Sequence, residues 1–130
     1  MSWKRHPKCT GVLDVTMLLA SAVTPAAPSG RVLISRTGDF VIISLDALRL
    51  AGEGNASILT IPTGFRPMHS IYMLATVRPA DWDSTVTAPV QGYSTGGFWL
   101  GRKHDDALHH GTFTYPTAQA WPTTLPGVSI

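Results

Sequence analysis

The chain of 130 residues is 44% hydrophobic and only 14% charged, which is too apolar for a disordered chain and typical of one domain with one core. Ten Lys and Arg residues against eight acidic residues leave a formal net charge of +2, so the sequence lacks the dense basic surface expected of a nucleic-acid-binding protein. The low charge content favours an oligomer that buries part of its surface, and the single cysteine excludes an intrachain disulfide.

The N-terminal residues predict a segment outside the main domain. Basic residues between positions 4 and 8 indicate a solvated tail, and Asp14 interrupts the apolar run that follows, which argues against a secretory signal. Residues 11–23 favour an edge strand over a short helix, and the stretch after them, rich in Pro, Ala, Ser and Gly, is typical of a linker. We therefore divide the chain into an attachment segment with its linker, residues 1–29, and a domain, residues 30–130. No apolar run approaches the roughly 20 residues that span a bilayer, so no membrane insertion is expected.

From residue 31 onward the sequence predicts strands. β-branched and aromatic runs recur between Gly, Pro, Asn and Asp residues, while helix signals are nearly absent, a pattern that indicates an antiparallel β-sandwich or barrel. The run RVLISRTGDFVIISLDALRL, residues 31–50, predicts a hairpin with its turn at Thr37-Gly38-Asp39. AGEGN, residues 51–55, is expected to be a loop.

The stretch IPTGFRP, residues 61–67, predicts a corner between two strands. The strand SILTI before it ends at Pro62, because proline has no N–H for the sheet ladder. Gly64 supplies the turn, and Pro67 forces Arg66 into an extended conformation. HSIYMLATV then resumes as a strand with alternate residues on one face.

Two further strands, STVTAPVQGY and GGFWLGR, precede a turn KHDDALHH and a last strand GTFTY. In the second of these strands Trp99 lies on the face opposite Phe98 and Leu100. The tail PTAQAWPTTLPGVSI is too rich in proline for a central strand and is expected to run extended over the surface or along a neighbouring subunit. A lone sandwich would leave the apolar side chains of the tail in water, so we predict Trp121 and Leu125 as subunit contacts. We add Trp99 of the strand GGFWLGR, because aromatic residues of the later strands are expected to line the subunit interface.

Gly92-Tyr93-Ser94-Thr95-Gly96 matches the G-x-S-x-G pattern of serine hydrolases. That pattern works as a strand-to-helix elbow on a large parallel sheet, whereas this sequence predicts antiparallel hairpins and no helix after Gly96. We therefore expect a glycine-rich turn, no enzymatic activity and no cofactor.

Five potential metal ligands lie within seven positions: His104, Asp105, Asp106, His109 and His110. Imidazole and carboxylate groups bind zinc and other transition metals, but a turn usually spreads such side chains into water. A solvated polar turn is therefore favoured. His104, His109 and His110 stay candidate ligands, especially if a threefold axis brings one histidine from each subunit together.

The loop Asp81-Trp82-Asp83 places an indole between two carboxylates. An exposed aromatic ring can stack on a sugar while the acids bind its hydroxyl groups, although a tryptophan at this position can also pack back on the rim of the fold. The candidate binding residues are therefore Asp81, Trp82, Asp83 and Tyr93. Tyr93 can alternatively be an aromatic residue of the core or of a subunit contact.

Three motifs in a fixed order carry a family resemblance: RTGDFVIISLDAL, then ILTIPTGFRP, then TYPTAQAWPTTLPG. Together they cover roughly residues 30–130. In them the chain resembles the C-terminal β-domain of minor tail proteins, tail fibres and receptor-binding proteins of tailed bacteriophages, particularly phages that infect actinobacteria. Such domains normally follow a long fibre shaft, whereas only residues 1–29 precede the domain here.

The resemblance implies a jelly-roll sandwich of the complement or tumour-necrosis-factor type that forms a homotrimer without catalytic activity. It implies a location on the tail or another external surface of the virion, contact with other virion proteins, and binding to a glycan or protein of the bacterial surface. The alternative is a structural protein of the tail tip or capsid surface that binds no receptor. The matching motifs are structural, so the resemblance assigns no binding residue.

Overall fold

The computed structural model describes residues 8–78 and 86–130 and contains nine β-strands and two short 3₁₀ turns. The strands are β1 (Leu13–Asp14), β2 (Arg31–Thr37), β3 (Phe40–Arg49), β4 (Gly54–Thr60), β5 (Ile71–Arg78), β6 (Val86–Gly92), β7 (Gly97–Lys103), β8 (Leu108–Pro116) and β9 (Val128–Ser129); the turns are η2 (Thr16–Leu18) and η3 (Ser21–Val23). No α-helix occurs in the described residues, and no segment there has the length and hydropathy of a membrane-spanning helix. The expected all-β fold is confirmed.

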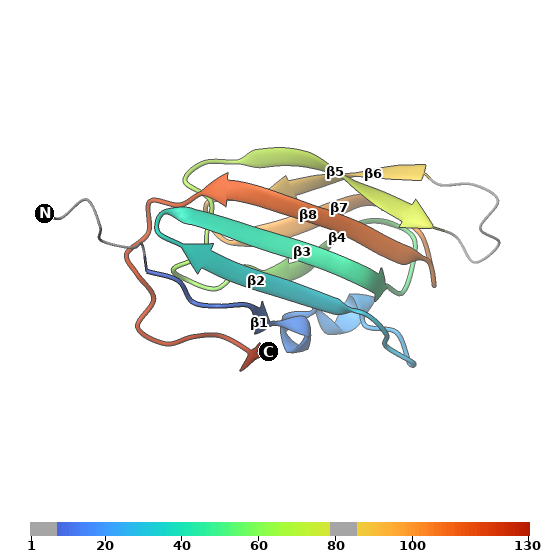
Figure 1. Cartoon of the computed structure of the whole chain (residues 1–130). Coiled ribbons are helices and arrows are strands. Elements are labelled where there is room, and N and C mark those ends of the chain that lie inside the picture. Colours follow the sequence, from blue (N-terminus) through green and yellow to red (C-terminus); the bar gives the residue numbers. More distant parts are fainter. Residues whose placement is uncertain (1–7, 79–85) are drawn as a thin grey trace, which may run out of the picture.

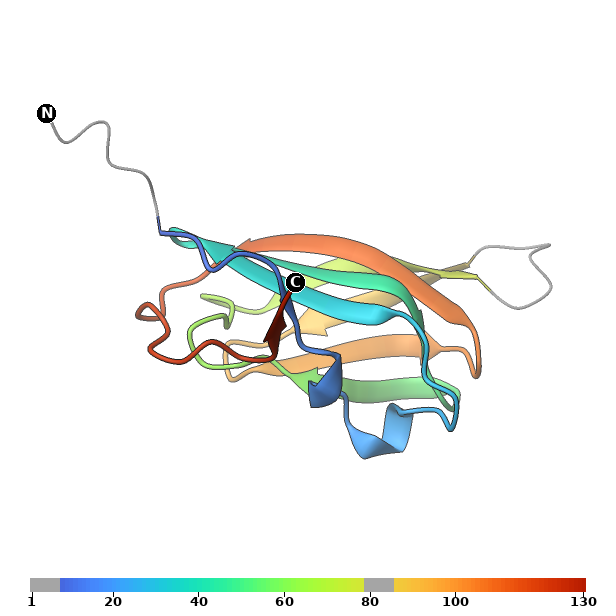
Figure 2. The ribbon, with the colours of Figure 1, turned by 60° about the horizontal axis from the view of Figure 1, so that its bottom comes forward.

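All nine strands belong to one antiparallel sheet with the order β4-β7-β6-β5-β8-β3-β2-β1-β9. The sheet curls on itself, so that β8, β3 and β2 form one layer and β6, β7 and β4 lie in the layer behind it (Figure 1). The view in Figure 2 shows the two layers facing each other. The antiparallel sandwich predicted from the alternating sequence pattern is therefore present.

One hydrophobic core fills the space between the layers. Alternation places every second side chain of the longer strands in this core, as in β2, where Val32 and Ile34 are buried and Leu33 between them is not. The largest fully buried side chains come from both layers and from the corner at 61–67: Ile34, Ile43, Leu48, Ile58, Ile61, Phe65, Phe98, Leu100 and Tyr115. Burial of each of these side chains contributes about 1.5–3 kcal/mol to stability. The buried hydroxyl of Tyr115 donates a hydrogen bond to the carbonyl of Phe65 at 2.7 Å, so this polar group has a partner.

The segment before residue 30 contributes to the same core. Leu13, Val15 and Val23 are buried, and the backbone N–H of Ala20 donates to the carbonyl of Ile58 in β4 at 2.8 Å. η2 and η3 lie along the side of the sandwich formed by β2 of one layer and β4 of the other (Figure 2). The edge strand expected over residues 11–23 is present only as the two residues of β1, which lies between β2 and β9, and the 3₁₀ turns η2 and η3 occupy six of the residues that follow. The division of the chain at residue 30 stays a prediction, and part of the proposed attachment segment packs on the domain.

The corner at IPTGFRP is confirmed. It connects β4 to β5, which lie on either side of β7 and β6 in the sheet, so the chain must cross the ends of those two strands. Gly64 has φ +95°, and a Cβ at this position would lie 2.8 Å from the Cβ of Pro122. Both the positive φ and the close approach of the tail therefore require glycine here.

Three expected boundaries differ from the structure. β4 begins at Gly54, inside the expected loop 51–55, and β8 begins at Leu108, so His109 and His110 lie in a strand rather than in the preceding turn. A bulge in β3 between Leu45 and Leu48 shifts its register and lets β3 pair with this early part of β8. The tail also adds a strand, because β9 pairs with β1 of the same chain.

Candidate functional site

One end of the sandwich, the corner end, contains the β2–β3 turn, the corner 61–67 and the start of the tail. Its centre is the guanidinium of Arg36, which is only 3% exposed. The guanidinium donates to the carbonyls of Gly38 (2.7 Å), Gly64 (2.7 Å), Gln119 (2.9 Å) and Ala120 (3.1 Å) and lies 3.5 Å from a carboxylate oxygen of Asp39. All three motifs behind the family resemblance therefore meet at one side chain.

Gln119 completes this network. Its side-chain oxygen accepts hydrogen bonds from the backbone N–H groups of Gly64 at 2.6 Å and Arg66 at 3.0 Å. The backbone N–H of Thr117 donates to the carbonyl of Asp39 at 2.8 Å. The tail is thus fixed to its own chain by groups that the corner would otherwise leave without partners.

Two of the predicted subunit contacts lie in the tail. The ring of Trp121 is half-buried and stacks under the Arg36 guanidinium, with 5.1 Å between the guanidinium carbon and the ring centroid. Leu125 is 45% exposed, on the stretch that leads to β9. Trp121 therefore has an intrachain role, and the part of both residues in an oligomer stays a prediction.

The opposite end, the charged end, contains the β3–β4 and β7–β8 turns and the three histidines proposed as metal ligands. His109 is fully buried, and its Nδ1 lies 3.2 Å from the carbonyl of Leu48 and 3.0 Å from that of Ala107. Because both partners accept, Nδ1 carries the proton, and Nε2 faces the backbone N–H of His104 at 3.5 Å. The adjacent residue His110 points to the other face of β8.

Within the described residues, this arrangement does not bring the three histidines together around one point. Both ring nitrogens of His109 face backbone groups, and the described residues contain no group of three or more His, Cys, Asp or Glu side chains that could hold a metal. A site shared between subunits stays untested. Burial lowers the pKa of His109 below its ordinary value near 6.5, so its ring is neutral at pH 7. Burial also lowers the pKa of Lys103, whose ammonium group donates to the carbonyl of Ala51 at 2.7 Å.

The G-x-S-x-G stretch forms the turn between β6 and β7. The N–H of Gly96 donates to the carbonyl of Tyr93, and β7 begins at the next residue, Gly97. Ser94 is exposed in this hairpin turn and has no helix behind it. The geometry lacks the strand-to-helix elbow that exposes a nucleophilic serine.

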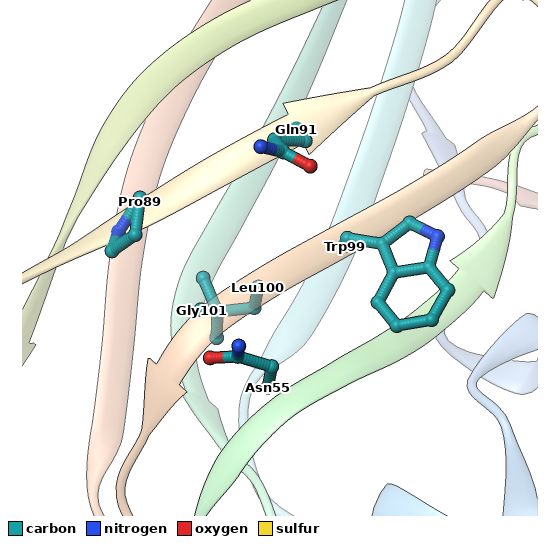
Figure 3. A pocket seen from close by; sticks show the side chains of 6 residues that line it. All are labelled: Asn55, Pro89, Gln91, Trp99, Leu100 and Gly101. Carbon is teal, nitrogen blue, oxygen red and sulfur yellow. The ribbon is translucent and has the colours of Figure 1, made fainter.

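Tyr93 lies near a hollow on the outer face of the layer formed by β6, β7 and β4. The hollow has a volume of about 220 Å³ and is lined by Asn55, Pro89, Gln91, Trp99, Leu100 and Gly101. Figure 3 shows the side chains of Asn55, Pro89, Gln91 and Trp99 around the β7 backbone. The hydroxyl of Tyr93 donates to the side-chain oxygen of Gln91. Trp99, predicted as a subunit contact, is thus part of a bounded surface feature.

Irregular pairing on both sides of β7 opens this hollow. The β6–β7 pairing covers Val90, Gln91 and Gly92 of β6 and does not extend to Pro89. Proline has no backbone N–H with which to continue the ladder. On the other side the β4–β7 register shifts between Gly54 and Ala56, so that Asn55 alone lies opposite Gly101 and Arg102, and β7 has the bulge. Gly101 therefore has no pairing partner in β4 or β6, and the side chains of Pro89 and Asn55 lie close to it.

The remaining candidates, Asp81, Trp82 and Asp83, lie outside the described residues. Sequence reasoning missed Asn55, Pro89 and Gln91 as members of a surface hollow. A usable signal was present in GGFWLG, because a period of two puts two glycines and a tryptophan on one face, and a second in the proline within VTAPVQG. Neither signal shows which side chains of neighbouring strands complete the hollow.

Neither a protein-family model nor a curated protein matches the sequence. The fold, in contrast, is similar to a solved structure described as the head domain of phage bIL170, one of the receptor-binding domains of lactococcal phages. The TM-score is 0.59 at 10% sequence identity, and the match covers 85% of this chain and 98% of that chain. The chain therefore has the fold of a phage receptor-binding head domain.

Proposed function

We propose that the protein is a host-recognition module of a tailed bacteriophage, which binds a glycan or protein of the bacterial surface and has no catalytic role. The observation that carries this proposal is the match of almost the whole head domain of phage bIL170 to this fold. The three sequence motifs support it independently, because they resemble phage tail and receptor-binding domains and converge on Arg36 in the structure.

A finer assignment follows from the same motifs. They resemble proteins of phages that infect actinobacteria, so we propose an actinobacterial host and a place on the tail or another external surface of the virion. The exposed apolar side chains of the two outer faces, among them Tyr72 and Leu74 on β5 and Phe40 and Ile42 on β3, support assembly into a homotrimer.

The test is adhesion of the purified, fluorescently labelled protein to a panel of actinobacterial and lactococcal cells. We expect saturable binding to a subset of actinobacterial strains. Loss after periodate treatment of the cells would identify a glycan receptor, and loss after protease treatment would identify a protein receptor. Absence of binding to every strain, together with tight binding to purified virions, would contradict the proposal and favour a structural role.

A further inference from the structure

The hollow on β7 combines an exposed aromatic ring with side-chain amides. Its floor is the outward face of β7, where Gly97, Trp99 and Gly101 alternate with core residues. We propose that this hollow binds a neutral sugar ring, with Trp99 as the stacking surface and Asn55 and Gln91 as hydrogen-bond donors. This inference rests on the proposed host-recognition function and assigns it a site.

The indole of Trp99 is held in place before any ligand arrives. It is 42% exposed, yet a Cβ at Gly97 would lie only 3.2 Å from its Nε1 and 3.3 Å from the Tyr93 ring. The ring therefore lies close against the strand beside Tyr93, and Figure 3 shows it nearly face-on. A fixed and accessible aromatic face can cover the apolar face of a sugar with little loss of side-chain entropy on binding.

The two amides are oriented by bonds to their oxygen atoms. The side-chain oxygen of Asn55 accepts the backbone N–H of Arg102 at 3.1 Å, and that of Gln91 accepts the Tyr93 hydroxyl. Each amide nitrogen keeps two N–H groups that have no protein partner among the described residues. The hollow thus offers donors in fixed positions, which suit the hydroxyl oxygens of a sugar.

The local backbone supports the same conclusion. Arg102 has φ +54°, a conformation that is unusual for a residue other than glycine, and the Asn55 side chain bonds to it at this point. This conformation belongs to the register shift between β4 and β7, and the bond to Asn55 holds the backbone beside the hollow in place. At Gly101 a Cβ would lie 2.8 Å from the Pro89 ring, so any larger residue would close the floor of the hollow.

Charge and backbone pairing select the ligand class. None of the six lining residues is charged, so nothing in the hollow compensates an anionic sugar or a phosphate. The backbone of β7 at Trp99 and Leu100 pairs with β4 on one side and β6 on the other, which leaves no free edge for an extended peptide to join. Recognition must therefore use side chains, as the stacking of a neutral pyranose does.

The experiment compares four proteins on an array of bacterial oligosaccharides that carries neutral and anionic members. These are the wild type, Trp99→Ala, Asn55→Asp and the control Met68→Ala. Asn55→Asp keeps the acceptor for the Arg102 N–H and removes the donor group, and Met68 is an apolar side chain with 49% exposure next to the corner 61–67. Melting temperatures and light scattering on each variant report the fold and the oligomeric state.

We expect the wild type to bind neutral members of the array, Trp99→Ala to bind them about tenfold or more weakly, and Met68→Ala to stay within about twofold. Asn55→Asp should lose several-fold. Wild-type binding to anionic members alone or to no member, or equal binding by Trp99→Ala and the wild type, would overturn the site. Cell adhesion by the same Trp99→Ala variant separates the two proposals, since unchanged adhesion would reject this hollow and retain host recognition.

Discussion

The corner end and the charged end of the sandwich use different side chains as hydrogen-bond donors to the carbonyl groups of their loops. Both bring together loops whose backbone carbonyls need hydrogen-bond donors. At the corner end the donor is the buried guanidinium of Arg36, and at the charged end it is the neutral imidazole of His109 together with the ammonium group of Lys103. A guanidinium keeps its proton at every pH at which proteins fold, whereas an imidazole gains a second one in mild acid. The donor group of His109 at the charged end can therefore change its protonation state in mild acid, whereas the donor group of Arg36 at the corner end cannot.

The largest loss of stability is expected from Arg36→Met. The change leaves the carbonyls of Gly64, Gln119 and Ala120 without their donor, so we expect the free energy of unfolding to fall by about 3–5 kcal/mol in urea denaturation. The matched control is Arg31→Met in the same strand, where the side chain is 47% exposed and pairs only with Asp46. That control should cost less than about 1 kcal/mol. Equal losses in both variants would show that the buried network has no special role.

The next largest effect is expected from Gly64→Ala. A Cβ at φ +95° is strained, and it would meet Pro122 at 2.8 Å, so the variant should lose about 1–3 kcal/mol of stability. Gly54→Ala is a useful control, because its φ is also positive but a Cβ there has nothing within 4 Å. Calorimetric melting of both variants separates backbone strain from the clash with the tail, and a larger loss at Gly54 would contradict the clash.

Acidification tests the charged end. Burial holds the pKa of His109 below 6.5, so the unfolded chain takes up the proton first, and the stabilisation is complete above about pH 6.5 and is lost as the pH falls below it. The slope is at most about 1.4 kcal/mol per pH unit. Urea unfolding from pH 7 to pH 5 should show this loss in the wild type.

His109→Asn should lack that part of the pH dependence, since an amide donates to the same carbonyls without titrating. His110→Asn, on the other face of β8, should keep it. A pH dependence that persists in His109→Asn and disappears in His110→Asn would reverse the assignment.

The smallest effect is expected from Trp121→Leu. It removes the stacking of the ring on Arg36, which is worth about 0.5–1 kcal/mol at a partly exposed position. Light scattering on the same variant then tests the proposed subunit contact. An intact oligomer with a small loss of stability would restrict Trp121 to its intrachain role, whereas dissociation would extend its role to the interface.

The sequence predicted most of this fold because its strands are half-buried and alternate. Val32, Ile34, Ala75 and Val77 follow the period of two and are buried as expected. Alternation carries no information about contacts between residues far apart in the sequence. It therefore did not predict the hydrogen bond from the Gly64 N–H to the side chain of Gln119. It also does not encode bulges, and the His109 prediction was wrong in its location because a bulge in β3 extends the pairing of β8.

The candidate site was predicted only in part for the same reason. Trp99 and Tyr93 were found as single aromatic residues, but their surroundings depend on three strands and on the irregular pairing at Pro89 and Asn55. A one-dimensional pattern gives the face on which a side chain lies. It does not give the gap between neighbouring strands, which defines the hollow.

The pairing of β9 with β1 has a consequence for the order of folding. Asp14 lies opposite Val128, so this ladder joins segments separated by nearly the whole chain, and the entropy of closing such a loop is lost before any contact compensates it. During synthesis β1 cannot meet β9 until residues 128 and 129 leave the ribosome, while the β2–β3 hairpin is complete much earlier. The β1–β9 edge should therefore form late and, since each strand has only two residues, exchange its amide protons first.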